Sequence, residues 1–222
     1  MNIPVILTNF KTALSGTGKN ALVLAKIHES VSQKTGVSIA VAVQAVDIFR
    51  ISQEVCIPVF AQYCDGISYG SHTGWMLPEA LREAGASGVI LNHSEHRFSE
   101  RKKLISAVQR AKEVGLFVCV CAETDQEGKE LSEMCQADVI AVEPPELIGG
   151  DISISTARPE LISHSVEQIS RVPVLVGAGV KNGEDVRIAK KLGAVGVLIA
   201  SGITKAENPE TALLDLAEGA KG

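Results

Sequence analysis

The sequence predicts an α/β fold: a single (β/α)8 barrel, with eight parallel strands surrounded by helices, formed by residues 1–222 as one domain. Two observations predict it. Short apolar, β-branched runs alternate eight times with segments of helical periodicity. No linker separates these units, and the first strand lacks the glycine-rich loop that an open nucleotide-binding sheet carries there. A closed barrel is therefore favoured over a long open sheet.

The expected elements follow from these runs. Strands are expected at Pro4–Asn9, Ser38–Val43, Pro58–Gln62, Gly88–Asn92, Leu116–Val120, Asp138–Val142, Val174–Gly177 and Gly196–Ala200. Helices are expected at Gly18–Thr35, Val46–Glu54, Pro78–Ala84, Glu100–Val114, Asp125–Cys135, Pro159–Ser170, Gly183–Leu192 and Pro209–Ala217. Glycines suited to a left-handed helix end follow four of these helices: Gly36, Gly85, Gly115 and Gly193.

Composition and charge narrow the classes of partner. Hydrophobic residues make up 45% of the chain and aromatic residues only 4%, so the core must be mainly aliphatic, as in parallel sheets covered on both faces. The net charge is −5 and no basic run is present, which argues against nucleic acid as the main partner. No stretch approaches the roughly 20 apolar residues of a membrane span, so no membrane contact is expected.

The five cysteines are interpreted as free thiols in a reducing cytoplasm. Cys56, Cys119 and Cys121 lie in or beside apolar runs and are expected to be buried. The Cys119–Cys121 spacing, with no histidine pair after it, does not match a zinc site, so no metal is expected. The N-terminus reaches polar residues too early for a signal peptide, which also favours a cytoplasmic protein.

Barrel enzymes carry their chemistry at the carboxyl ends of the strands, so polar residues there are candidate site residues. Asn9 and Lys11 follow the first strand on one side of an extended segment, and the ammonium could bind a phosphate or a developing oxyanion. His93 follows the fourth strand and could donate a hydrogen bond to a carbonyl, with its neighbours orienting it. The alternatives are a solvated surface lysine and a structural polar cluster.

Glu143 follows the sixth strand and is a candidate general base, because burial can raise the pKa of a carboxyl group. The segment after it has a stiff hinge at Pro144–Pro145, an apolar tip at Leu147–Ile148 and a flexible hinge at Gly149–Gly150. This pattern is typical of a lid that closes over a ligand. The alternative is a plain loop with an incidental glutamate.

Small residues end the seventh and eighth strands, at Gly177-Ala178-Gly179 and Ala200-Ser201-Gly202. They allow the backbone to approach a ligand closely, and successive N–H groups can bind a phosphate. Barrels often bind phosphate at this pair of loops. Small residues also make tight turns, so neither segment alone is a specific indication of phosphate binding.

The ordered motifs Asn9-Phe10-Lys11, Asn92-His93-Ser94-Glu95, Glu143–Gly149, Gly177-Ala178-Gly179 and Ala200-Ser201-Gly202 resemble triosephosphate isomerases, specifically their short archaeal branch. The resemblance runs over nearly the whole chain. It implies isomerisation of D-glyceraldehyde 3-phosphate and dihydroxyacetone phosphate through an enediolate, in glycolysis and gluconeogenesis. It implies no cofactor.

The resemblance also implies residue roles. Glu143 would be the base and His93 the neutral electrophile. Lys11 would supply a fixed positive charge beside the enediolate oxygens and the phosphate, with Asn9 positioning the substrate. Phosphate-binding and lid contacts would come from Ile148, Gly179, Ala200 and Ser201. Supporting roles would fall to Glu95, Thr73, Gly149, Gly177 and Gly202.

The segment Ser68–Gly74 is similar to the family's protruding third loop, which inserts into a partner subunit, with Thr73 reaching toward the partner's active site. A homodimer is therefore expected, with further pairing into a tetramer, as in many archaeal members. Three departures stand out. Trp75 replaces a common glutamate, His96 replaces a common arginine, and Pro145-Glu146 stands where other lids have an aromatic residue.

Other barrel proteins remain alternatives. A metal-dependent sugar-phosphate epimerase would need several His and Asp ligands at strand ends, and only one strand end carries histidines. An indole-pathway isomerase would need another acid–base pair. A barrel retained only for binding would have lost the base or the electrophile, whereas Glu143, His93 and Lys11 are all present.

Overall fold

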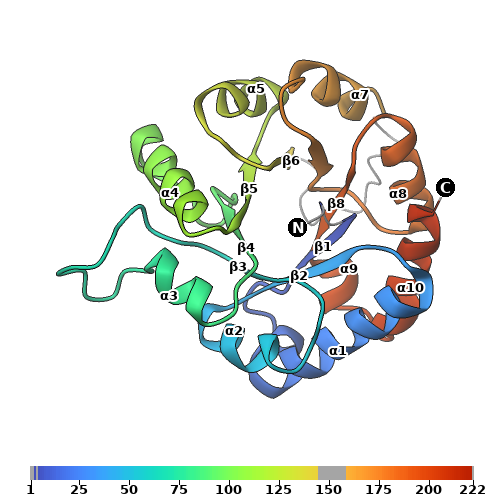
Figure 1. The fold of residues 1–222 in the computed structure, drawn as a ribbon. Helices are drawn as coiled ribbons and strands as arrows, with labels where there is room; N and C mark the ends of the chain where they lie inside the picture. Colours follow the sequence, from blue (N-terminus) through green and yellow to red (C-terminus); the bar gives the residue numbers. More distant parts are fainter. Residues whose placement is uncertain (1–2, 4, 145–158, 222) are drawn as a thin grey trace.

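The computed structural model describes residue 3, residues 5–144 and residues 159–221. The eight strands pair in chain order, all parallel, and the first pairs with the eighth to close a barrel (Figure 1). The strands are β1 (Ile6–Asn9), β2 (Ile39–Val43), β3 (Val59–Ala61), β4 (Gly88–Leu91), β5 (Phe117–Ala122), β6 (Val139–Val142), β7 (Val174–Val176) and β8 (Gly196–Ile199). The predicted fold is confirmed.

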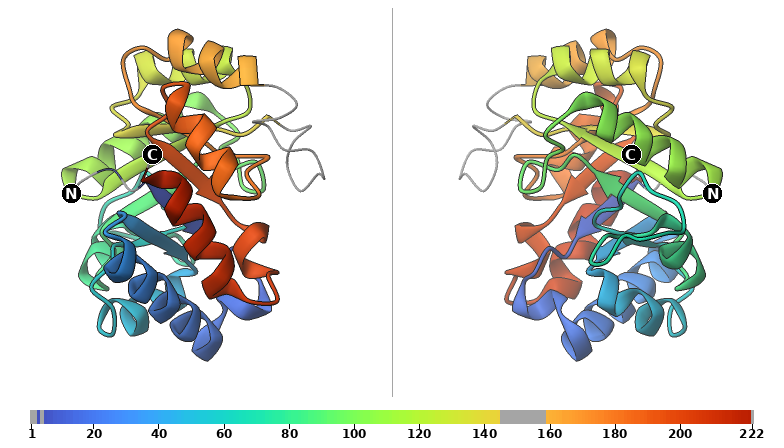
Figure 2. Two further views of the ribbon diagram at one scale, coloured as in Figure 1. Left: turned by 90° about the vertical axis from the view of Figure 1, so that its right-hand side faces the viewer. Right: turned by 90° about the vertical axis from the view of Figure 1, so that its left-hand side faces the viewer.

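Helices surround this sheet, as the two side views in Figure 2 show. They are α1 (Gly18–Thr35), α2 (Ala45–Ser52), α3 (Pro78–Glu83), α4 (Arg101–Glu113), α5 (Asp125–Met134), α7 (Pro159–Gln168), α8 (Gly183–Lys191), α9 (Ser201–Thr204) and α10 (Pro209–Ala220), with a 3-10 turn, η1, at Leu14–Gly16. No helix in the described part of the chain combines the length and apolarity needed to cross a membrane.

The core has two layers because successive strand residues point to opposite faces of the sheet. On β5, Cys119 and Cys121 point into the barrel, where they pack with residues such as Leu7, Phe60 and Leu198. Val118 on the same strand faces outward and joins the larger cluster between the sheet and the helices. Side chains therefore fill the barrel below its carboxyl end, which leaves the mouth as the place for a ligand.

Helix ends follow the expected glycine pattern. Gly36, Gly85, Gly115 and Gly193 have φ angles of 72°, 99°, 79° and 98°, in the left-handed region where other residues are strained. The Gly115 N–H bonds the Lys112 carbonyl and the Leu116 N–H bonds the Ala111 carbonyl, so the chain turns directly from α4 into β5. These short turns bring each strand back into the sheet.

One expectation was wrong, and one short helix was not expected. Cys56 is exposed: its backbone N–H donates to Glu29 Oε1 at 2.5 Å in the loop after α2, and its thiol faces solvent beside buried Val55. Ser201 and Gly202, expected at the end of the eighth strand, begin the short helix α9, whose first turn closes on the Ala200 carbonyl. Four residues are too few to produce a helical pattern in the sequence.

The segment between β3 and α3 projects sideways from the barrel (Figure 1). Its base is held together by Asp65 and Met76: the Asp65 N–H bonds the Met76 carbonyl at 2.9 Å, and Asp65 Oδ2 accepts the Met76 N–H at 2.6 Å. Between them the tip, which includes Thr73 and Trp75, is exposed. A fixed base with an exposed tip suits a segment that contacts another molecule.

Candidate active site

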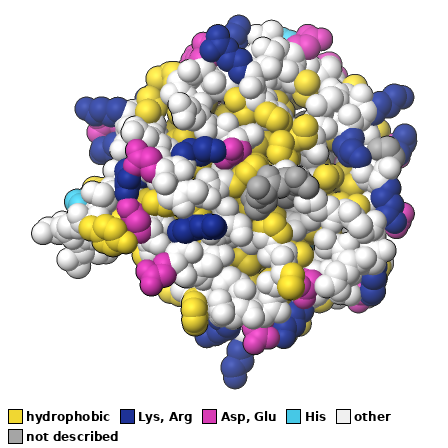
Figure 3. All heavy atoms as spheres, in the orientation of Figure 1, with side chains coloured by type: hydrophobic (Ala, Val, Ile, Leu, Met, Phe, Trp, Pro, Cys, Tyr) yellow, Lys and Arg dark blue, Asp and Glu magenta, His cyan; other side chains and the backbone are white. Residues whose placement is uncertain are grey.

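A cleft of about 890 Å³ opens at the carboxyl ends of the strands. The predicted site residues that lie in the described part of the chain and line it are Asn9, Lys11, His93, Glu95, Glu143, Gly177, Gly179, Ala200, Ser201 and Gly202. The mouth of the barrel faces away from the viewer in Figure 3, which shows the opposite end, with apolar side chains near the centre and charged ones around them. Five strand ends thus contribute to one cavity.

Glu143 follows β6, where its N–H bonds the Ala122 carbonyl at 2.8 Å, and only 4% of it is exposed. Burial raises its pKa from 4.5 to about 7, although the Cys121 thiol and Lys11 oppose the rise by favouring the charged form. Its Oε2 is buried and accepts no hydrogen bond from a described residue. A carboxylate with such a pKa and an unpaired oxygen is suited to accept a proton near neutral pH.

Gly177 on the neighbouring strand end makes room for this carboxyl group. A Cβ at position 177 would lie 2.5 Å from Glu143 Cγ and 3.0 Å from the Val142 carbonyl oxygen. The glycine is therefore required by the packing of Glu143, and its N–H donates to the Val142 carbonyl at 2.8 Å.

His93 faces Glu143 with its Nε2 atom, 3.4 Å from Oε1. Its Nδ1 lies 3.1 Å from the backbone nitrogen of Glu95 and accepts that N–H, so the ring proton of the neutral imidazole is assigned to Nε2. Burial, with a smaller effect of the Lys11 charge, lowers the pKa of His93 to about 4. The imidazole is thus a neutral donor directed into the cleft.

Lys11 has a φ of 50°, a left-handed backbone that costs a non-glycine residue on the order of 1 kcal/mol. Asn9 stabilises this turn: its Oδ1 accepts the Lys11 N–H at 2.9 Å. The ammonium lies 2.8 Å from Glu95 Oε1. The strained turn directs the lysine toward the loop that carries His93.

Gln62 was missed by the sequence analysis, although the predicted third strand ended on it. Its amide nitrogen lies 3.2 Å from Asn9 Oδ1, 3.0 Å from the Lys11 carbonyl and 3.3 Å from the Ala42 carbonyl. It therefore holds the ends of β1 and β2 together under the lysine. The sequence feature that could have indicated Gln62 is a polar glutamine at the carboxyl end of a predicted barrel strand.

The loop after β4 is fixed in a similar way by Asn92, whose φ is 60°. Its Nδ2 donates to the Cys121 carbonyl at 3.0 Å and its Oδ1 accepts the Phe98 N–H at 3.3 Å. His96 does not line the cleft; it stacks on Tyr63, with ring centroids 4.2 Å apart. His93 is therefore the histidine available to a ligand here.

The loops after β7 and β8 form the opposite wall of the cleft. Gly179 has a φ of 72°, and the backbone N–H groups of Gly179, Ser201 and Gly202 make no hydrogen bond with another described residue. Two lysines that the sequence analysis did not select, Lys181 and Lys205, also line this wall. Free N–H groups beside lysines are suited to an anion.

Three predicted residues lie outside this cavity or outside the described chain. Thr73 is at the exposed tip of the projecting segment, so within one chain it does not reach the cleft. Ile148 and Gly149, with the proposed lid, lie outside the described residues. Among the residues that the structure describes, no group of three or more His, Cys, Asp or Glu side chains is arranged to bind a metal.

Comparisons with known proteins show the family of the chain. The model of the triosephosphate isomerase family matches residues 4–220. A triosephosphate isomerase from Methanosarcina barkeri is 46% identical, over 97% of this chain and 98% of that protein. The corresponding enzyme of Metallosphaera sedula is 42% identical, over 99% and 97%.

The fold of this chain is also similar to that of a solved triosephosphate isomerase. A crystal structure of triosephosphate isomerase from Bartonella henselae superposes with a TM-score of 0.73, covering 99% of each chain at 20% identity. At that identity the likeness concerns the fold alone, whereas the methanogen and Metallosphaera relatives fit the archaeal-type branch. The chain therefore belongs to the triosephosphate isomerase family.

Proposed function

We propose that this chain, an isomerase by its family, interconverts D-glyceraldehyde 3-phosphate and dihydroxyacetone phosphate in glycolysis and gluconeogenesis. One observation carries the residue assignment. A neutral imidazole donor lies 3.4 Å from a buried carboxyl group, in the same cleft as a lysine. Proton transfer next to a carbonyl needs these three groups: a base, a hydrogen-bond donor and a fixed positive charge.

In this proposal Glu143 removes the proton from the carbon beside the carbonyl and returns it to the neighbouring carbon. The pKa of about 7 supports this role, because a base with a pKa near the working pH can both accept and release a proton. His93 Nε2 donates to the substrate oxygen on which the negative charge of the enediolate develops. Lys11 adds a positive charge beside that oxygen. The hydroxyl proton passes from one substrate oxygen to the other as the carbonyl changes place. This division of roles is the one described for triosephosphate isomerases.

The phosphate group would bind at the wall formed by Gly179, Ala200, Ser201 and Gly202. The support is the N–H groups of Gly179, Ser201 and Gly202, which line the cleft and bond to no other described residue. Asn9 would position the substrate and hold the Lys11 turn. Glu95 would orient Lys11 and His93, since it pairs with one and donates its N–H to the other. Ile148 and Gly149 are proposed as lid contacts on the resemblance alone.

The proposal takes residues 1–222 as one catalytic domain with no cofactor. It also includes a homodimer through the Ser68–Gly74 loop, with Thr73 directed toward the partner's cleft, and further pairing into a tetramer. The exposed tip of that loop on a fixed base supports it. Five free thiols suit the reducing cytoplasm in which we place the protein.

A coupled assay tests the activity. D-glyceraldehyde 3-phosphate is supplied, and the ketose formed is reduced by an auxiliary dehydrogenase that consumes NADH. The Glu143→Gln variant, purified in the same way, measures any isomerase carried over from the expression host. Turnover by the wild-type chain well above that background is expected. Equal rates for the two preparations at micromolar enzyme would reject the function.

A further inference from the structure

The loops after β7 and β8 have so far been assigned only backbone groups as phosphate ligands, whereas Lys11, the side chain assigned to offset the substrate's charge, lies on the loop after β1. Gly177, Gly179, Ala200 and Gly202 contribute only backbone groups there. A phosphate monoester carries close to two negative charges near neutral pH. Lys11 is already 2.8 Å from the Glu95 carboxylate, which offsets part of its charge. A further cation at this wall would favour a phosphate dianion.

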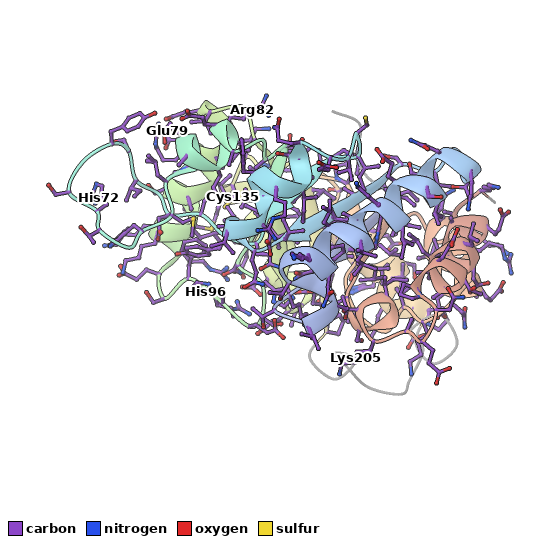
Figure 4. All side chains as sticks on the ribbon, turned by 90° about the horizontal axis from the view of Figure 1, so that it is seen from below. His72, Glu79, Arg82, His96, Cys135 and Lys205 are labelled. Atoms are coloured by element: carbon purple, nitrogen blue, oxygen red, sulfur yellow. The ribbon has the colours of Figure 1, made fainter. Side chains whose placement is uncertain are left out.

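Lys205 is such a cation. It follows α9 directly, lines the cleft together with Ser201 and Gly202, and is exposed. Its ammonium forms no ion pair or hydrogen bond with a residue in the described part of the chain. In Figure 4 it lies at the same end of the barrel as His96, opposite to Glu79 and Arg82. Its charge therefore lies at the mouth and is not offset by a described acidic neighbour.

The backbone that carries Lys205 is fixed. Its N–H bonds the Ser201 carbonyl at 3.1 Å, and the preceding Thr204 carbonyl accepts the Ser15 hydroxyl at 2.6 Å. Ser15 belongs to η1, in the loop that also carries Lys11. The backbone at Lys205 is thus held by the loops after β1 and β8. Binding a ligand therefore costs only the conformational entropy of the Lys205 side chain.

We infer that Lys205 binds the phosphate group of the substrate and increases selectivity for phosphorylated over unphosphorylated trioses. The inference rests on the proposed function, since it concerns the same cleft. The contact is between a lysine ammonium and phosphate oxygens at a partly exposed rim. It is made equally in the ground state and the transition state, so it acts on KM and leaves kcat unchanged.

The test compares Lys205→Ala with a matched charge control, Lys26→Ala. Lys26 pairs with Glu54 at 2.9 Å on the outside of α1, so its removal changes the net charge equally but far from the cleft. Calorimetry measures binding of 2-phosphoglycolate and of inorganic phosphate. Steady-state assays give kcat and KM for D-glyceraldehyde 3-phosphate, and NMR follows isomerisation of D-glyceraldehyde, which has no phosphate. Lys205→Arg is the conservative variant.

We expect Lys205→Ala to raise KM and both dissociation constants about three- to tenfold at low salt, with kcat and D-glyceraldehyde turnover unchanged. Lys205→Arg restores binding, and added salt narrows the difference by screening the charge. Unchanged dissociation constants in Lys205→Ala, or an equal loss of affinity in Lys26→Ala, would overturn the inference. So would a loss of D-glyceraldehyde turnover in Lys205→Ala as large as its loss with D-glyceraldehyde 3-phosphate. Should the wild-type chain fail to isomerise, the two binding measurements still test Lys205 separately.

Discussion

A Cβ atom at Gly177 would lie 2.5 Å from the Cγ of Glu143. Gly177→Ala is therefore expected to displace the carboxyl group and to lower kcat by about 10²-fold, the effect of a misplacement of roughly 1 Å. Gly128→Ala is the matched control, because its added methyl would overlap Ile169 Cδ1 behind α5, outside the cleft. Similar kcat losses in the two variants, measured in the coupled assay, would indicate general destabilisation instead.

Shortening the base tests its role directly. Glu143→Asp withdraws the carboxylate by one methylene and is expected to lower kcat by roughly 10²–10⁴, the span of positioned general-base catalysis. Steady-state kinetics measure it, with circular dichroism as the check on folding. Near-normal turnover in this variant would remove Glu143 from the mechanism.

The raised pKa of Glu143 predicts how stability depends on pH. The folded state binds this proton more tightly than the unfolded chain, with a pKa of about 7 against 4.5. Its contribution is full below pH 4.5 and is lost as the pH rises through 7. Glu143→Gln should therefore exceed the wild type in unfolding free energy by about 2–3 kcal/mol at pH 8 and by much less at pH 5. Urea unfolding at both values measures this, and an equal difference at both would contradict the raised pKa.

His28 predicts the opposite dependence in the acid range. It is fully buried, its Nδ1 lies 2.7 Å from the Leu24 carbonyl and its Nε2 3.0 Å from Thr8 Oγ1, and burial lowers its pKa from 6.5 to about 4. Stability from this group is present above pH 6.5 and is lost as the pH falls through 4. From pH 7 to pH 4, His28→Gln should lose about 2–3 kcal/mol less unfolding free energy than the wild type. Urea unfolding at the two pH values measures this, and an equal loss of unfolding free energy in the wild type and in His28→Gln would refute it.

Removing the charge of Lys11 tests whether it faces the ligand. Lys11→Met keeps the length of the side chain and is expected to weaken 2-phosphoglycolate binding by more than about tenfold, because a partly buried charge in a cleft interacts more strongly than one at the surface. The Lys34→Met variant, which breaks a surface pair with Glu210, is the control. Unchanged affinity in Lys11→Met, measured by calorimetry, would refute a ligand-facing lysine.

The sequence predicted the barrel because each βα unit carries its own local signals. Apolar strands, prolines at Pro78 and Pro209 and left-handed glycines such as Gly115 all act over a few neighbouring residues. The barrel then brings the predicted strand ends to one edge, so Lys11, His93 and Glu143 line one cleft. Their catalytic roles stay predictions that the variants above test.

Other features depend on contacts between distant segments, which no local pattern encodes. Gln62 matters through its approach to Asn9 and Lys11, and Cys121 through its closeness to Glu143 on the next strand. The exposure of Cys56 depends on which way one loop residue turns. Lys205 looks like any surface lysine until α9 positions it at the mouth.

With the role proposed for Lys11, the left-handed turn at this residue sets thermal stability against turnover at a single position. Asparagine adopts this backbone more readily than lysine does, so Lys11→Asn would relieve local strain while removing the charge. Directed evolution that selects for thermal stability alone would therefore favour asparagine at this position. The resulting variants would be more stable but would lose isomerase activity. Only a screen that selects for enzyme activity as well as thermal stability would retain lysine at position 11, despite the strain of its backbone.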